Sequence, residues 1–164
     1  MTRSPAPSPH SLGDHLTLLL AEGGGLGCLP VAPGTFGSLA GLPLGWLLWH
    51  WQVPVPFRLT LWLAMFLVGI PLCQRAAVLR GKKDPGSVVW DEITAFPLIF
   101  SMIQDSWMML VGGFLLFRVF DVAKPWPVKR FEQLPGGLGI MADDQIAALY
   151  AGAVLLVLQS SGLL

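Results

Sequence analysis

The chain has 164 residues, a length that suits one domain and is short for two. Its ten basic residues balance ten acidic ones, which argues against a nucleic-acid partner, because such proteins present a basic face to phosphates. Hydrophobic residues make up 54% of the chain and charged residues only 12%, so we expect part of the exterior to face lipid.

The N-terminal segment, residues 1–11, is rich in proline and serine and predicts a disordered tail. It lacks the apolar core and the small-residue cleavage site of a signal peptide. Membrane insertion would therefore depend on internal segments, and we expect one domain over residues 12–164.

Four apolar stretches follow along the chain: residues 39–53, 59–73, 93–120 and 146–164. A full membrane span needs roughly 20 apolar residues, so the first two stretches are marginal. The third is interrupted by Gln104, Asp105 and Ser106, which leaves two short halves. Two interpretations remain open at this point: short helices that pair as hairpins dipping into the bilayer, or a compact helical bundle that sits partly in the membrane.

The basic residues favour the hairpins. Eight of the ten cluster in the two connections on either side of residues 93–120, and only Arg3 and Arg58 fall elsewhere. The eight are Arg75, Arg80, Lys82 and Lys83 before it, and Arg118, Lys124, Lys129 and Arg130 at its end and after it. The positive-inside rule places both clusters in the cytoplasm, which requires the chain to turn back near residues 104–106. The predicted fold class is all-α: a compact multi-helical bundle with short, partly membrane-embedded helical hairpins. Three polar segments, 23–38, 81–92 and 118–144, then meet at one face.

Seven of the ten acidic residues lie in two of these polar segments: Asp84, Asp91, Glu92, Asp121, Glu132, Asp143 and Asp144. A hard cation such as Mg²⁺ takes oxygen ligands, typically one or two carboxylates together with phosphate oxygens of the substrate. Neighbouring residues on a helix point about 100° apart. We therefore expect each acidic pair, Asp91–Glu92 and Asp143–Asp144, to supply one metal ligand, with its neighbour supporting that ligand or binding another ion.

A simpler interpretation is that these acids cap helices. Asp143 precedes the last apolar stretch, and Asp91 precedes a helix expected to begin near Ile93. Capping explains one acid in each pair. It does not explain why both acids are doubled beside apolar helices, where a second charge costs desolvation free energy.

Arg118, Asp121 and Lys124 are spaced three residues apart and share one face of a helix that Pro125 and Pro127 end. In one hypothesis the cations contact phosphate oxygens while Asp121 orients them or binds the metal. In the other, this is an ion-paired helix end with cations that extend to the membrane surface. The spacing does not choose between them.

Two glycine-rich segments are candidates for substrate binding. Residues 23–38 contain Gly-Gly-Gly-Leu-Gly and Ala-Pro-Gly-Thr-Phe-Gly-Ser, and residues 135–139 form a second flexible loop before Asp143. Glycines let backbone N–H groups approach an anion, and the following helix offers its positive end. Neither segment has the spacing of a dinucleotide fingerprint or a P-loop. The candidate contacts are Thr35, Ser38 and Gly137.

Four segments, in this order, resemble the phosphatidylglycerophosphatase A family. They are residues 32–39, residues 84–85 with 88–92, residues 117–127 and residues 134–144. Together they run through most of the chain from residue 23 to residue 150, and four ordered motifs make a specific match. The resemblance implies an all-α fold and Mg²⁺-dependent hydrolysis of phosphatidylglycerophosphate to phosphatidylglycerol. It also implies a place in the bacterial inner membrane, with the active site on the cytoplasmic face.

The resemblance and the residues together give the following site hypothesis. Metal ligands are Asp91, Glu92, Asp143 and Asp144; catalytic residues are Asp121, Lys124 and Asp144; substrate-binding residues are Thr35, Ser38, Arg118, Lys124 and Gly137. The sequence lacks Cys-x5-Arg and Asp-x-Asp-x-Thr/Val signatures, which leaves metal-assisted attack by water.

Two alternatives compete with this function. One is a transporter or assembly subunit without enzymatic activity, whose ionisable residues should sit in the middle of a span. The other is a phosphatase for a different phosphate ester, which would share the site but not the head group.

Overall fold

The computed structural model describes residues 11–104 and 106–163, and within these ranges it contains helices and no strand. In chain order they are α1 (Leu12–Ala21), the short 3-10 segment η1 (Gly23–Cys28), α2 (Pro33–His50), α3 (Val55–Arg80), α4 (Trp90–Met102), α5 (Trp107–Ala123), α6 (Val128–Phe131) and α7 (Gly137–Ser160). The predicted all-α class is confirmed. Residues 1–10 of the predicted tail lie outside the described residues, whereas Ser11 caps α1 by accepting the N–H of Asp14 at 3.1 Å.

The four apolar stretches all form helices, but α7 begins earlier than the sequence predicts. Residues 137–139 of the predicted flexible loop already belong to its first turn. Glycine is needed there for packing, because a Cβ on Gly137 would overlap the carbonyl oxygen of Ile70 on α3. Asp143 therefore lies inside α7 and does not cap it, and Asp91 likewise lies within α4, whose N-cap residue is Val89.

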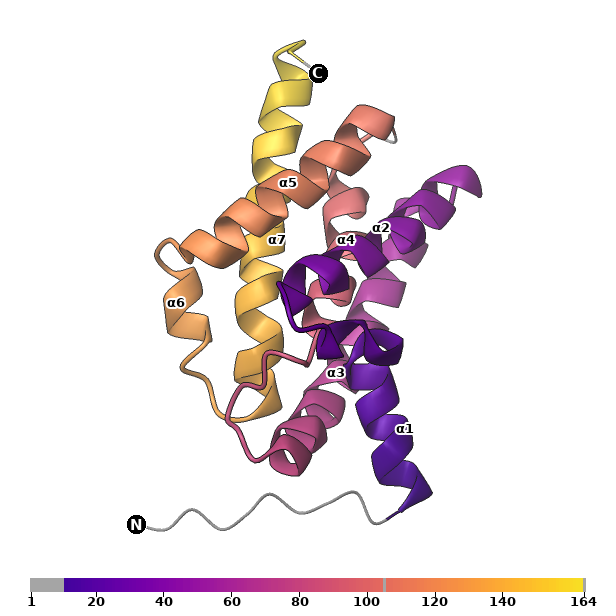
Figure 1. Cartoon of the computed structure of the whole chain (residues 1–164). Helices are drawn as coiled ribbons and strands as arrows, with labels where there is room; N and C mark the ends of the chain where they lie inside the picture. Colours follow the sequence, from indigo (N-terminus) through magenta and orange to yellow (C-terminus); the bar gives the residue numbers. More distant parts are fainter. Residues whose placement is uncertain (1–10, 105, 164) are drawn as a thin grey trace.

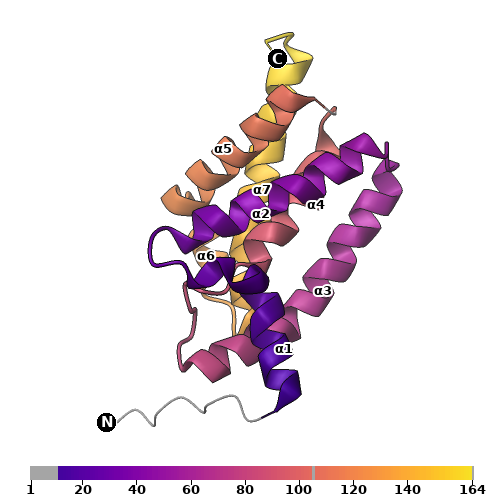
Figure 2. The same cartoon turned by 45° about the vertical axis from the view of Figure 1, so that its right-hand side comes forward.

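α4 occupies the centre of the bundle, with α2, α3 and α7 packed around it (Figures 1 and 2). Phe96 and Ile99 of α4 are fully buried, as are Phe117 of α5 and Ala148 of α7. α2 approaches α4 through glycines. Gly41 and its neighbour one turn on, Gly45, lie against the rings of Phe96 and Phe100, and a Cβ at either glycine would overlap a ring. Small residues at a helix interface permit this close approach of backbones.

α3 and α7 are the two described helices that are long and apolar enough to cross a membrane. α3 has 26 residues and is therefore about 39 Å long, more than the hydrocarbon thickness of a bilayer. Only 11% of its most apolar 18-residue stretch is buried, and Phe57, Leu67 and Val68 are each more than half exposed. An exposed apolar surface of this kind requires lipid or a partner, which agrees with a membrane protein.

The connection between α4 and α5 is the predicted turn at residues 104–106. α4 ends at Met102, and Ser106 caps α5 by accepting the N–H of Met109 at 3.1 Å. Asp105 itself lies outside the described residues. This turn and the C-terminal end of α7 lie at one end of the bundle, whereas α1, α6 and the start of α7 lie towards the other (Figure 1).

Candidate active site

The three polar segments meet at a cavity of about 200 Å³ near the N-terminal ends of α2, α4 and α7. Its lining includes six carboxylates, from the connection after α3 and from α4, α5 and α7. The lining residues are Pro33, Gly34, Asp84, Gly86, Val88, Asp91, Glu92, Asp121, Lys124, Asp143 and Asp144. We call it the acidic cavity. The three segments thus meet at one face, as their positions between the apolar stretches predict.

Asp91 and Glu92 stand in the first turn of α4 and are buried. The Oδ1 atom of Asp91 accepts the N–H of Glu92 at 3.0 Å. The side chain of Gln145 connects three helices here: it accepts the indole N–H of Trp62 at 2.8 Å and donates to the carbonyl oxygen of Asp91 at 3.2 Å. The start of α4 is thereby held against α3 and α7.

Arg118 joins α5 to α4 and α2. Its Nη1 atom donates to Oε1 of Glu92 at 3.2 Å, to Oγ of Ser38 at 3.4 Å and to Oδ2 of Asp121. Ser38 in turn donates to the carbonyl oxygen of Gly34 at 2.8 Å. Arg118 therefore links α5 to α4 and α2 and pairs with two carboxylates, and it is not a solvated cation at a helix end.

Glu92 lies so close to α2 that only glycine fits opposite it. A Cβ on Gly34 or on Gly37 would overlap one of its carboxylate oxygens. The Oε2 atom of Glu92 is the one buried side-chain oxygen without a hydrogen-bond partner in the part of the chain that the structure describes.

Lys124 follows α5 in a left-handed conformation and reaches α7. Its Nζ atom pairs with Asp143 at 2.7 Å and with Glu132 at 3.2 Å. Burial acts to lower the pKa of Lys124, but the bonds to the two carboxylates outweigh it and raise the pKa, so the side chain stays charged.

Negative charge exceeds positive charge in the acidic cavity. Asp84, Asp91 and Asp144 form no ion pair with any residue in the described ranges. Burial raises the pKa of Glu92 to about 8 although Arg118 opposes this, and burial together with the charge of Glu92 raises the pKa of Asp91. Ionising this cluster is therefore costly unless a cation neutralises it.

The donor chemistry of the cavity fits a hard divalent cation. Carboxylate oxygens are the ligands that Mg²⁺ prefers, and the unpartnered oxygen of Glu92 and the unpaired aspartates provide them. No three acidic, cysteine or histidine side chains of the described residues converge closely enough to form a ready-made metal site. Binding a cation would therefore require the carboxylates to rotate towards one another.

The structure brings most of the candidate residues together. Six of them line the acidic cavity: Asp91, Glu92, Asp121, Lys124, Asp143 and Asp144. Ser38 and Arg118 support its wall through Glu92. Thr35 is half-buried in the first turn of α2 and does not line the cavity. Gly137 lies against α3, where its N–H donates to Oε1 of Gln74 at 2.8 Å, and it does not line the cavity either.

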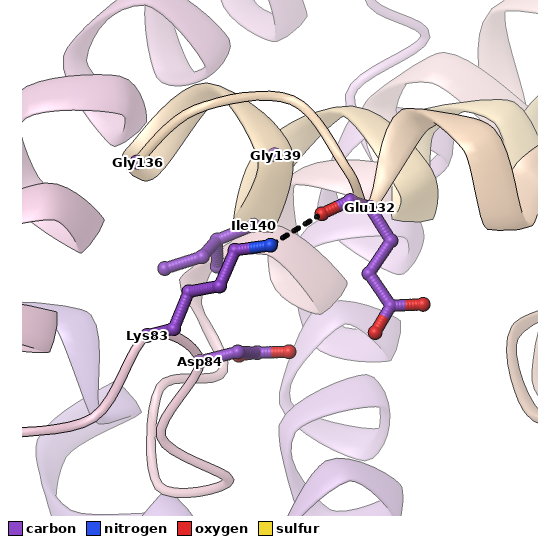
Figure 3. A pocket seen from close by; sticks show the side chains of 6 residues that line it. All are labelled: Lys83, Asp84, Glu132, Gly136, Gly139 and Ile140. Carbon is purple, nitrogen blue, oxygen red and sulfur yellow. Dashed lines mark hydrogen bonds between the residues drawn. The ribbon is translucent and has the colours of Figure 1, made fainter.

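Asp84 is the carboxylate of the cavity that the site hypothesis omits. It also borders a small adjoining pocket of about 30 Å³ with Lys83 and Glu132 (Figure 3). There the Nζ atom of Lys83 donates to the carbonyl oxygen of Glu132 at 3.4 Å, which ties the connection after α3 to the segment before α7. The Asp84-Pro85 stretch, which is part of the family resemblance, is the sequence signal for this residue.

The carboxylate-lined cavity defines a helical protein with an acidic site, and the two long apolar helices suggest a membrane protein. Comparison with known proteins identifies the family: the family model for phosphatidylglycerophosphatase A matches residues 19–159. The chain therefore belongs to the phosphatidylglycerophosphatase A family.

Individual relatives agree with this assignment. Phosphatidylglycerophosphatase A of Haemophilus influenzae is 43% identical over 143 residues, which cover 86% of this chain and 87% of the relative. Phosphatidylglycerophosphatase A of Escherichia coli is 37% identical over 141 residues, covering 84% and 80%. A Bacteroides thetaiotaomicron protein with the provisional name phosphatidylinositol-3-phosphatase is 34% identical over 145 residues, covering 83% and 89%. No solved structure matches the chain.

Proposed function

We propose that this protein hydrolyses the terminal phosphate monoester of phosphatidylglycerophosphate in a Mg²⁺-dependent reaction that yields phosphatidylglycerol and inorganic phosphate. The observation that carries the proposal is the acidic cavity, where six carboxylates adjoin Lys124 and Arg118 at one end of a membrane bundle. The family and the names of two relatives supply the substrate.

The residues of the cavity divide the chemistry among them. Asp91, Glu92, Asp143 and Asp144 are the proposed holders of Mg²⁺, with Asp84 a further donor at the same cavity. When bound, Mg²⁺ supplies polarisation of a phosphate oxygen and a lowered pKa for the attacking water. Asp144, which has no cationic partner in the described residues, is the proposed acceptor of the proton from that water.

Lys124 and Arg118 stabilise the charge that develops on the phosphoryl group. Phosphate oxygens compete with Asp143 for the Nζ atom of Lys124, which is already charged and directed into the cavity. Asp121 holds the guanidinium of Arg118 beside Glu92, so that Arg118 acts from a fixed position. Charge stabilisation by groups that are already in place lowers the barrier without reorganisation.

The test is phosphate release from phosphatidylglycerophosphate in neutral detergent micelles, with Mg²⁺ and then with EDTA. Release that depends on Mg²⁺ supports the proposal. Release that persists in EDTA contradicts the metal dependence, and no release by folded protein contradicts the activity.

A second substrate has a specific observation in its favour, since the Bacteroides relative carries the provisional name phosphatidylinositol-3-phosphatase. Phosphatidylinositol 3-phosphate is therefore the competing substrate in the same assay. A higher kcat/KM for it than for phosphatidylglycerophosphate would transfer the proposal to that lipid. The transporter alternative is disfavoured, because Asp91 and Glu92 lie in the first turn of α4 and Asp143 and Asp144 lie in the first third of α7, not in the middle of a span.

We further propose that the acidic cavity faces the cytoplasm from the bacterial inner membrane. The support is the basic residues at that end of the bundle, including Lys83 in the connection after α3 and Lys129 in α6. α7 carries Asp143 and Asp144 of the cavity in its first third and runs on to the opposite end of the bundle (Figure 1). A reporter fused after α7 should therefore lie outside the cytoplasm. An alkaline phosphatase fused there should be active. Fluorescence from a reporter that folds only in the cytoplasm, fused at the same position, would indicate the opposite orientation.

A further inference from the structure

A second, larger cavity of about 510 Å³ lies beside the acidic cavity. Its lining comes from η1, from the start of α2, and from the end of α3 with the connection that follows. The lining residues are Gly27, Cys28, Leu29, Pro33, Arg80, Lys82, Pro85, Gly86 and Ser87. Pro33 and Gly86 also line the acidic cavity, so the two cavities are immediate neighbours. We call the second one the basic cavity.

The two cavities have opposite charge. Six carboxylates line the acidic cavity, whereas the lining of the basic cavity contains Arg80 and Lys82 and no carboxylate. An anionic group that the carboxylates repel would therefore bind more favourably in the basic cavity.

Arg80 is held in place by a buried carboxylate behind it. Its Nε and Nη2 atoms donate to the two oxygens of Glu22, both at 2.6 Å. Glu22 is 4% exposed and also accepts hydrogen bonds from Ser87 at 2.8 Å and Cys28 at 3.2 Å. A two-point contact of this kind fixes the plane of the guanidinium. The third nitrogen of Arg80, Nη1, donates to no residue in the described ranges.

Lys82 supplies the positive charge that nothing in the described chain neutralises. It is exposed and forms no ion pair there, whereas Glu22 offsets the charge of Arg80. Two parts of its wall touch each other, since a Cβ on Gly27 would overlap the carbonyl oxygen of Ser87. The basic cavity thus carries a positive charge that no carboxylate of its lining offsets.

We propose that the basic cavity binds the phosphodiester of the lipid substrate while the terminal monoester occupies the acidic cavity. This inference rests on the proposed function, because that substrate carries two phosphates joined by one glycerol. The diester bears a single negative charge and is not cleaved, so its site needs a cation but neither a metal nor a nucleophile. Lys82 and the Nη1 edge of Arg80 are the cationic groups. They would favour a lipid that carries one phosphate on each side of its glycerol.

The experiment compares two inhibitors, each of which represents one of the two phosphates of the substrate. Phosphatidylglycerol retains the diester and lacks the monoester, whereas inorganic phosphate resembles the monoester alone. Inhibition constants are measured in neutral detergent micelles for the wild type and for Lys82→Glu. The control is Lys129→Glu, which makes the same charge change at an exposed position of α6 that lines neither cavity.

In Lys82→Glu we expect the Ki of phosphatidylglycerol and the KM of the substrate to rise about tenfold, the scale of one lost charge-assisted hydrogen bond. The Ki of inorganic phosphate and kcat should stay within about twofold. An unchanged Ki for phosphatidylglycerol overturns the proposal. An equal rise of this Ki in Lys129→Glu also overturns it. So does an equal weakening, in Lys82→Glu, of inhibition by oleate, which is anionic but has no phosphodiester. Either outcome would indicate general attraction to a negative micelle surface.

Failure of the proposed function would look different. If the wild type hydrolyses no phosphatidylglycerophosphate, binding of phosphatidylglycerol is followed directly by tryptophan fluorescence in the same micelles. Weaker binding by Lys82→Glu alone would still support the basic cavity as a phosphodiester site, and equal binding by all three proteins would overturn it.

Discussion

α3 and α7 are alike as sequences and opposite as parts of the structure. Both are long, apolar helices, with mean hydropathies of 1.8 and 1.5 over their most apolar windows. Yet 61% of the α7 window is buried against 11% of the α3 window. α7 presents small residues such as Ala147 and Ala151 to its neighbours and carries two cavity carboxylates, whereas α3 turns large apolar side chains outwards. Hydropathy thus identifies an apolar helix, and side-chain size distinguishes the core helix from the exposed one.

The largest expected effect concerns the chemistry that α7 carries. Asp144→Asn keeps the shape of the side chain but removes its charge, and we expect kcat/KM to fall about a thousandfold, or about 4 kcal/mol in activation free energy. The measurement is phosphate release with saturating Mg²⁺. Asp14→Asn on α1 is the matched control, because it makes the same change outside the acidic cavity, and it should stay within about twofold. Wild-type activity in Asp144→Asn would remove this residue from the mechanism.

The packing difference between the two helices can be tested directly. Leu155 of α7 is 1% exposed, and Leu67 of α3 is 56% exposed. Leu155→Ala should lower the free energy of unfolding by about 2–5 kcal/mol, because it leaves a cavity in the core. Leu67→Ala should cost about 1 kcal/mol or less. Unfolding in mixed detergent micelles measures both, and equal losses would mean that α3 is packed as α7 is.

A charge on α3 tests whether lipid covers it. Leu67→Lys should disfavour insertion by about 2.5–3.5 kcal/mol if the position lies in the middle of the bilayer. Leu12→Lys is the control, since Leu12 is 78% exposed on α1, which is too short to span. The amount of protein in washed membranes should fall for the first variant only. Equal recovery of both would place α3 in water or against a partner.

The smallest expected effect is the pH dependence of the ion pair at the end of α3. Burial of Glu22 acts to raise its pKa, but hydrogen bonds from Arg80, Ser87 and Cys28 outweigh it and hold the pKa below its usual 4.5. A lowered pKa stabilises the folded state above the unfolded pKa, and this stability is lost as the pH falls through the folded value. In Glu22→Gln, the unfolding midpoint should therefore fall less than in the wild type as the pH is lowered. An identical acid response in the variant would assign it to other carboxylates.

Much of this arrangement could be predicted from the sequence. The interrupted third stretch predicts the turn between α4 and α5, and the doubled acids predict a carboxylate cluster. Proline and charge mark the end of α5, where Lys124 adopts a left-handed conformation. These features are local, because each depends on residues that are close together in the chain.

What could not be predicted depends on contacts between distant segments. The start of α7 at Gly137 is one case, since glycines usually mark loops and only contact with Ile70 on α3 explains a helix there. The partner of Lys124 is another: spacing suggests Asp121, but the chain after α5 turns and brings Lys124 to Asp143. Asp84 joins the cavity only because the connection after α3 folds back over it.

The glycines of α2 that face α4 make two sequences interdependent. Because Gly41 has no side chain, the ring of Phe96 occupies the volume that a Cβ would need. Gly41→Ala should therefore be strongly destabilising alone and much less so beside Phe96→Leu, and a double-mutant cycle would measure the difference as a coupling energy. We therefore expect a substitution at one of these positions to be tolerated only with a compensating change at the other. Glu92, opposite Gly34 and Gly37, is subject to the same packing constraint.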